Sequence, residues 1–140
     1  METLFAEEAI ITNVPEKLLW SICHTESRLS VLAYNHHDGG HNNSAFGVCQ
    51  VLLKTAEGLG FKDRRGKCRT GHAKCRLFDP QTNIRYAAKY LKKQLVRYKN
   101  NIKLAVSAYN AGTAKKCKKR LCNQKYVDKV LEIYNNRENT

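Results

Sequence analysis

Residues 14–27 read VPEKLLWSICHTES. The apolar residues of this stretch recur at helical spacing and form one stripe, which comprises Leu18, Leu19, Ile22 and Cys23. Asn13 stands before the stretch as a candidate N-cap, and Pro15 falls in the first turn, where proline is favoured. The pattern predicts an amphipathic helix that ends near Ser27 and packs its stripe against a core.

Glu26 lies on the same stripe, four residues after Ile22. A carboxyl group at the end of an apolar face is either a surface residue, often in a salt bridge, or a buried acid. Burial raises the pKa of a carboxyl group and keeps a proton available near neutral pH, as a general acid requires. Helical spacing alone favours the surface interpretation and leaves Glu26 as a candidate catalytic residue.

The rest of the sequence also favours helices, separated by turn-rich segments. Helical patterns occur at residues 2–11, at residues 54–59, from Asp79-Pro80 to Tyr98, from Leu104 to Gly112, and from Val127 to Tyr134. Residues 34–44 are polar and indicate a loop, and a short β-hairpin fits the region 34–52. The sequence therefore predicts one compact, mainly α-helical domain over residues 1–140.

The chain is strongly basic, with 25 Lys and Arg against 12 Asp and Glu and a formal charge of +13. Such a surface attracts polyanions, which include nucleic acid and the anionic polymers and lipid headgroups of a cell envelope. The alternative is an ordinary solvated surface. We find neither a signal peptide nor an apolar run of the roughly 20 residues that span a bilayer. A soluble protein without a membrane span is expected.

The six cysteines allow disulfides or a metal site. Disulfides are the favoured interpretation for four of them, Cys68, Cys75, Cys117 and Cys122. Zinc held by these four thiolates with His72 nearby is the alternative, although their spacing differs from the usual Cys-x2-Cys knuckles. A second loop is crowded with histidines, namely His36, His37 and His41. Cys23 and Cys49 lie on apolar stretches and are expected to be buried thiols, and no cofactor is expected.

Three motifs follow one another in the chain: Glu26-Ser27, then Gly47-Val48-Cys49-Gln50, then Ala108-Tyr109-Asn110-Ala111-Gly112. In this order they resemble the lytic transglycosylases that carry the soluble lytic transglycosylase (SLT) domain. A closing Tyr126-Val127 pair extends the resemblance to residues 3–135. The resemblance implies an α+β lysozyme-like fold. Among members of the family, the chain most resembles those associated with phages or secretion systems. Cys49 stands where Met is common in the family, and Cys122 where Glu is common.

The resemblance implies cleavage of the β-1,4 bond between N-acetylmuramic acid and N-acetylglucosamine in peptidoglycan. Glu26 would act first as general acid and then as base, and the product would be a 1,6-anhydro ring formed without water. The substrate-binding residues implied are Ser27, Gly47, Gln50, Leu52, Ala108, Tyr109, Asn110 and Tyr126.

Each motif residue has an expected role. Ser27 is expected to bond near the sugar, and Gly47 to allow close backbone approach. The amide of Gln50 suits an acetamido group. Tyr109 is expected to hold Glu26 or the N-acetyl group. Asn110 is expected to fix the turn beneath that tyrosine, and Tyr126 to line the groove.

Three other functions compete with this one. A goose-type-like lysozyme would hydrolyse the bond with a second carboxylate that positions water, and Asp38 is the candidate. A Cys/His metal or polyanion-binding module is the second, and an inactive wall-binding part is the third, against which the intact Glu26 argues. We expect a monomer without specific nucleic-acid binding that acts at the cell wall or periplasm. Without a visible signal peptide, delivery by phage lysis, a virion or a secretion apparatus is expected.

Overall fold

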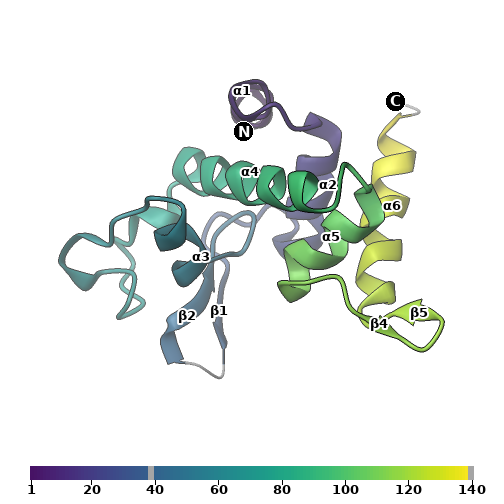
Figure 1. Cartoon of the computed structure of the whole chain (residues 1–140). Helices are drawn as coiled ribbons and strands as arrows, with labels where there is room; N and C mark the ends of the chain where they lie inside the picture. The colour runs from purple at the N-terminus through teal and green to yellow at the C-terminus, as the bar shows by residue number, and fades with distance from the viewer. Residues whose placement is uncertain (38–39, 139–140) are drawn as a thin grey trace.

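The computed structural model describes residues 1–37 and 40–138, and Figure 1 shows how their elements are arranged. The helices are α1 (Glu2–Thr12), α2 (Glu16–Ser27), α3 (Leu53–Gly58), α4 (Pro80–Arg97), α5 (Ile102–Ala111) and α6 (Gln124–Glu138). The strands are β1 (Tyr34–His37), β2 (Gly40–Phe46), β3 (Val51–Leu52), β4 (Lys116–Cys117) and β5 (Arg120–Leu121). This confirms the expected mainly α class with a small β component, including the hairpin in the region 34–52.

Two helix boundaries follow directly from local sequence. α4 begins at Pro80 because the Asp79 carboxylate accepts the backbone N–H of Thr82 at 3.0 Å, as an N-cap residue does. α5 ends where Gly112 takes a left-handed conformation with φ of 84°, which a residue without a Cβ adopts at little cost. Both boundaries agree with the predicted ones.

The boundary between α1 and α2 differs from the prediction. Asn13 does not cap α2; it ends α1 in a left-handed conformation, with φ of 57°. Asparagine is one of the few residues other than glycine that tolerate this conformation. Pro15 then occupies the N-cap position of α2, with no side-chain cap.

The small sheet has the antiparallel order β1-β2-β3. Tyr34 pairs with Phe46 and Asn35 pairs with Ala45, so alternate residues of the hairpin face opposite sides. Phe46 is fully buried in the core. Its neighbour Ala45 belongs to the other face, which borders the cleft described below.

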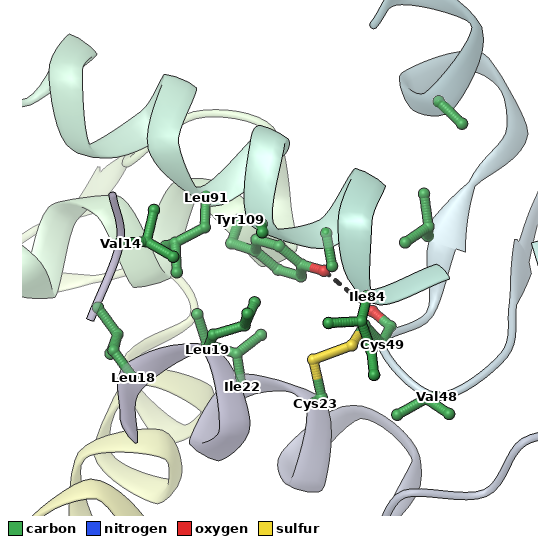
Figure 2. Close-up of a cluster of buried hydrophobic side chains, with 14 of the residues drawn as sticks. Val14, Leu18, Leu19, Ile22, Cys23, Val48, Cys49, Ile84, Leu91 and Tyr109 are labelled. Carbon is green, nitrogen blue, oxygen red and sulfur yellow. Dashed lines mark hydrogen bonds between the residues drawn. A yellow bond between two sulfur atoms is a disulfide. The ribbon is translucent and has the colours of Figure 1, made fainter. Parts of the chain in front are cut away.

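The core forms where the stripe of α2 meets α4 and the turn after β2. Leu18, Leu19 and Ile22 of α2 are fully buried. Figure 2 shows them in one cluster with Val48 of the turn and with side chains of α4, and the core also holds Ile84 and Leu91 of α4. In Figure 1 the hairpin and α3 lie on one side of the molecule, and α5 and α6 lie on the other.

All six cysteines form disulfides, in the pairs Cys23–Cys49, Cys68–Cys75 and Cys117–Cys122. The disulfide prediction is confirmed for the last two pairs. The prediction of buried thiols for Cys23 and Cys49 is wrong, because the turn after β2 brings Cys49 directly against α2 (Figure 2). Among the described residues there is no His/Cys/Asp/Glu group arranged to hold a metal ion. None of the described helices has the length and apolar character of a membrane span.

Candidate active site

Glu26 lies one residue before the end of α2, beside a cleft of about 360 Å³. The cleft is bounded by the hairpin, by the turn and strand after it, and by the end of α5. Its lining residues are Glu26, Asn35, His36, Ala45, Gln50, Leu52, Tyr109 and Asn110. The first and last of the three sequence motifs are separated by 80 residues, and all three meet at one cleft.

A second cavity of about 300 Å³ continues this cleft. The two cavities share Gln50, Leu52, Tyr109 and Asn110 along their common boundary. The second cavity extends away from Glu26 to Tyr90 on α4 and to Gly112 after α5. The two cavities therefore lie next to each other on either side of the shared residues, and Glu26 lines one of them.

The carboxyl group of Glu26 has an unusual environment. Burial raises its pKa from 4.5 to about 7, and a hydrogen bond from Tyr126 opposes part of this increase. The hydroxyl of Tyr126 donates to Oε2 of Glu26 at 2.7 Å. No other carboxylate is among the described residues that line the cleft. Glu26 is therefore half protonated near neutral pH and can either donate or accept a proton.

One buried tyrosine, Tyr109, and one partly buried tyrosine, Tyr126, lie close to this carboxyl group. Burial and the charge of Glu26 raise the pKa of both Tyr109 and Tyr126 well above its ordinary value, so both hydroxyls remain neutral donors. Tyr109 donates to the backbone carbonyl of Cys49 at 3.0 Å (Figure 2) and not to Glu26. The residue that holds Glu26 is Tyr126, for which the sequence predicted a place in the groove wall.

The turn from Gly47 to Gln50 is fixed by the buried amide of Asn83 on α4. Its Nδ2 donates to the carbonyls of Phe46 and Leu77, at 2.6 and 2.7 Å, and its Oδ1 accepts the N–H of Cys49 at 2.8 Å. A Cβ on Gly47, whose φ is 75°, would lie 2.6 Å from the Asn83 Nδ2 atom. Glycine is required there by close approach of the protein's own side chain.

The predicted site residues do not all reach the cleft. The Ser27 hydroxyl donates to the carbonyl of Val48 at 2.6 Å, and so connects α2 to the turn. Ala108 is buried and contributes its carbonyl to the Tyr90 hydroxyl at 3.4 Å. Neither residue lines the cleft. Asp38 lies outside the described residues.

The side chain of Gln50 lines the cleft but is also held by the protein. Its Oε1 accepts from Asn35 at 2.6 Å, and its Nε2 donates to the Gly47 carbonyl at 3.1 Å. Asn110 is exposed at the end of α5, where its Oδ1 accepts from Asn123 at 2.9 Å. The role of Asn110 under Tyr109 remains a prediction, as does sugar binding by either amide.

Sequence reasoning missed Asn35, His36 and Ala45 as lining residues, and Asn83 as the support of the turn. A signal for Asn35 and Ala45 existed in the alternation of the hairpin. Once Phe46 is placed in the core, Ala45 and its cross-strand partner Asn35 must face the cleft. Asn83 had a weaker signal, as a polar residue directly before the core residue Ile84.

The family model of the transglycosylase SLT domain matches residues 3–131. Protein IpgF of Shigella sonnei is 30% identical to the chain over 126 residues, which covers 87% of this chain and 72% of IpgF.

Among solved structures, an inactive mutant of the lytic transglycosylase Slt from Pseudomonas aeruginosa superimposes with a TM-score of 0.69 at 21% identity. The match covers 98% of this chain but only 24% of Slt, so the chain spans about a quarter of that enzyme, and the similarity shows the fold. The family match over nearly the whole chain confirms the resemblance found in the sequence motifs. The chain therefore belongs to the transglycosylase SLT domain family and, as a member of this family, is classed as a peptidoglycan lytic transglycosylase.

Proposed function

We propose that this protein cleaves the β-1,4 bond between N-acetylmuramic acid and N-acetylglucosamine without water, with Glu26 as both acid and base. One observation carries the proposal: the cleft holds a carboxyl group whose pKa is about 7 and that has a single strong hydrogen-bond partner. A group that is half protonated near neutral pH suits a mechanism in which it gives up a proton and then regains one.

The first step uses the protonated form of Glu26. Tyr126 occupies Oε2, and Oε1 accepts no hydrogen bond from any described residue, which leaves Oε1 to face a substrate. From there the proton passes to the glycosidic oxygen as its bond to C1 of the muramic acid breaks. The electron pair of that bond stays with the leaving N-acetylglucosamine. The acetamido oxygen of the muramic acid stabilises the positive charge that develops at C1.

The second step uses the carboxylate that the first step creates. Glu26 removes the proton from the C6 hydroxyl of the muramic acid, and O6 forms a bond to C1. This closes the 1,6-anhydro ring and returns Glu26 to its protonated form. The hydrogen bond from Tyr126 stabilises the charged intermediate form of the carboxyl group, because a donor to a carboxylate favours ionisation.

The count of carboxylates favours this lyase over a hydrolase. Most glycosidases use two carboxyl groups, the second as nucleophile or to activate water. Glu26 is the one carboxylate among the described residues of the cleft. The goose-type-like alternative depends on Asp38, which is outside the described residues, and the products distinguish the two reactions.

We also propose how this enzyme meets its substrate. Proteins of the SLT family act on the cell wall. A single catalytic domain over residues 1–140, a monomeric state, and delivery by phage lysis, a virion or a secretion apparatus are parts of the proposal. Contacts with anionic envelope polymers follow from the charge of +13.

Mass spectrometry of the products from purified peptidoglycan tests the reaction. We expect muropeptides with 1,6-anhydro ends from the unmodified enzyme, and products with reducing ends alone would contradict the lyase. Glu26→Gln keeps the size of the side chain but removes its transferable proton, so we expect activity to fall at least about a thousandfold.

The matched control is Glu132→Gln, at an exposed position of α6, which should retain full activity. Circular dichroism should show both variants folded. Substantial wall cleavage by folded Glu26→Gln would overturn the assignment of Glu26.

A further inference from the structure

Residues 62–76 form a strongly basic segment, which we call the basic loop. It holds seven of the 25 Lys and Arg residues of the chain and one of its 12 Asp and Glu residues. The disulfide Cys68–Cys75 closes it, and both sulfur-bearing residues are buried. The chain therefore fixes a high density of positive charge in a constrained loop, where like charges repel one another.

The one acid of the basic loop, Asp63, forms no ion pair with these cations in the part of the chain that the structure describes. The Asp63 carboxylate accepts the backbone N–H groups of Cys68 at 2.7 Å and Arg69 at 3.0 Å. It thus serves the fold of the loop. Within residues 1–37 and 40–138, none of the loop's cationic side chains forms an ion pair with an acid.

The cationic side chains of the loop surround a cavity of about 340 Å³. Its lining residues are Phe61, Asp63, Arg64, Arg65, Lys67, Cys68, Lys74 and Arg76. It shares no residue with the cleft at Glu26. In Figure 1 the loop extends from the α3 side of the molecule, away from α5 and α6. This cavity is a separate concave site that the proposed reaction does not use.

We propose that this cavity binds a phosphate ester group of the bacterial envelope. A guanidinium presents a planar fork of donors that matches phosphate, and an ammonium adds a point charge. Arg64, Arg65 and Arg76 supply the first kind of group, and Lys67 and Lys74 supply the second. A phosphate removes the mutual repulsion of these side chains. The phosphate site rests on the loop itself, and only the envelope as its source rests on the proposed function.

The shape of the site argues against nucleic acid. Binding of single strands uses an extended basic track together with aromatic rings on which bases stack. Phe61 is the one Phe, Tyr or Trp residue among the described residues that line this cavity, and it is only 5% exposed. A single phosphate group, on a wall polymer or a lipid headgroup, fits the cavity better.

Binding experiments with three probes test the proposal. The probes are a glycerol-phosphate polymer, vesicles of phosphatidylglycerol in phosphatidylcholine, and a DNA duplex. The loop variant carries Arg64→Gln, Lys74→Gln and Arg76→Gln, all exposed. The control carries Lys115→Gln, Lys116→Gln and Lys119→Gln, also exposed, and loses the same net charge. Cosedimentation or calorimetry gives the dissociation constants.

We expect the unmodified protein to bind the polymer or the vesicles, and the better ligand identifies the source of the phosphate. The loop variant should lose at least about tenfold in affinity, which is the effect of one lost charge-assisted hydrogen bond, and the control less than about threefold. Equal losses in both variants, no binding to either envelope probe, or tighter loop-dependent binding to DNA would overturn the proposal. Unchanged cleavage of soluble glycan fragments by the loop variant would show that it is folded and separate this result from any failure of the proposed reaction.

Discussion

At the scale of single residues, the chemistry of Glu26 depends on two opposing effects. Burial disfavours its charged form, and the Tyr126 hydroxyl favours that form through the 2.7 Å hydrogen bond. The balance places the pKa of Glu26 at about 7, where both protonation states are populated. The position of Tyr126 thus controls the pH range in which the proposed acid is available.

We predict that kcat/KM declines as pH rises through about 7, because the first step needs protonated Glu26. Tyr126→Phe removes the hydrogen bond that lowers the pKa of Glu26, so the decline should move to higher pH. It should also reduce the maximal rate by roughly tenfold, because the carboxylate formed in the first step loses its donor.

Steady-state rates on soluble glycan fragments between pH 5 and pH 9 measure both effects. The matched control is Tyr134→Phe, also on α6, which should leave the pH profile unchanged. A profile for Tyr126→Phe that shifts to lower pH, or does not shift, would contradict the role assigned to this tyrosine.

The sequence predicted Glu26 as the catalytic residue but did not predict Tyr126 as its hydrogen-bond partner. The apolar stripe and the Glu-Ser motif both marked Glu26. Tyr126 is 100 residues further along the chain, and nothing local to α6 indicates that its hydroxyl reaches α2. The motif also suggested sugar contacts for Ser27, whose hydroxyl instead bonds the Val48 carbonyl. A motif records which residues are needed, and only packing decides whether each one touches substrate or supports the site.

At the scale of elements, the site depends on how α2 is joined to the turn after β2. The disulfide Cys23–Cys49 links them three residues before Glu26 and one residue before Gln50. Asn83 fixes the same turn from α4 through its bond to the Cys49 N–H, and Tyr109 does so from α5 through the Cys49 carbonyl. Three elements therefore hold the residues of the cleft in register.

We predict that Cys23→Ala with Cys49→Ala lowers the free energy of unfolding by about 3 kcal/mol, the entropic effect of a cross-link that spans 26 residues. Activity should also fall, because the turn loses its covalent link to α2. Urea unfolding followed by circular dichroism, together with glycan cleavage, measures the two effects.

The matched control is Cys117→Ala with Cys122→Ala, which opens an exposed hairpin with no residue in the cleft. It should cost less stability and leave cleavage unchanged. Equal losses of activity in both double variants would contradict a specific role for Cys23–Cys49.

Elements were more predictable than the links between them. The helix starting at Asp79-Pro80 and the stop at Gly112 are encoded by a few neighbouring residues, and both were predicted. The prediction that Asn13 caps the start of α2 was wrong. Asparagine is favoured both at the start and at the end of a helix, and the local sequence does not show which of these two positions it takes. The Cys23–Cys49 pairing depends on the turn that Asn83 supports, which is a tertiary contact.

At the scale of the whole molecule, few ion pairs link the helices within the described residues 1–37 and 40–138. A buried exception is Glu8 of α1, which is fully buried and bonds Arg85 of α4 at 2.9 Å. The apolar pattern of α1 gave no signal for this pair. With so many cations and few acids, most positive charge lies unpaired on the surface, where it is available to anionic partners.

The free energy of unfolding should depend on the protonation state of Glu26. At pH 4 and below, the carboxyl group is largely protonated in both folded and unfolded chains and contributes no pH dependence. Between its unfolded pKa of 4.5 and its folded pKa of about 7, the unfolded chain releases the proton while the folded chain keeps it. Stability therefore falls as pH rises through this window, by up to about 3 kcal/mol.

Glu26→Gln removes this dependence, because the amide is neutral at every pH and still accepts the Tyr126 hydrogen bond. We predict that the variant is more stable than the unmodified protein by up to about 3 kcal/mol at pH 8 and similar to it at pH 4. Urea unfolding at the two pH values measures the difference, with Glu132→Gln as the exposed control. A constant difference at both pH values would mean that Glu26 is not held in its raised-pKa environment, and the proposed acid would then lack the physical basis for its proton at neutral pH.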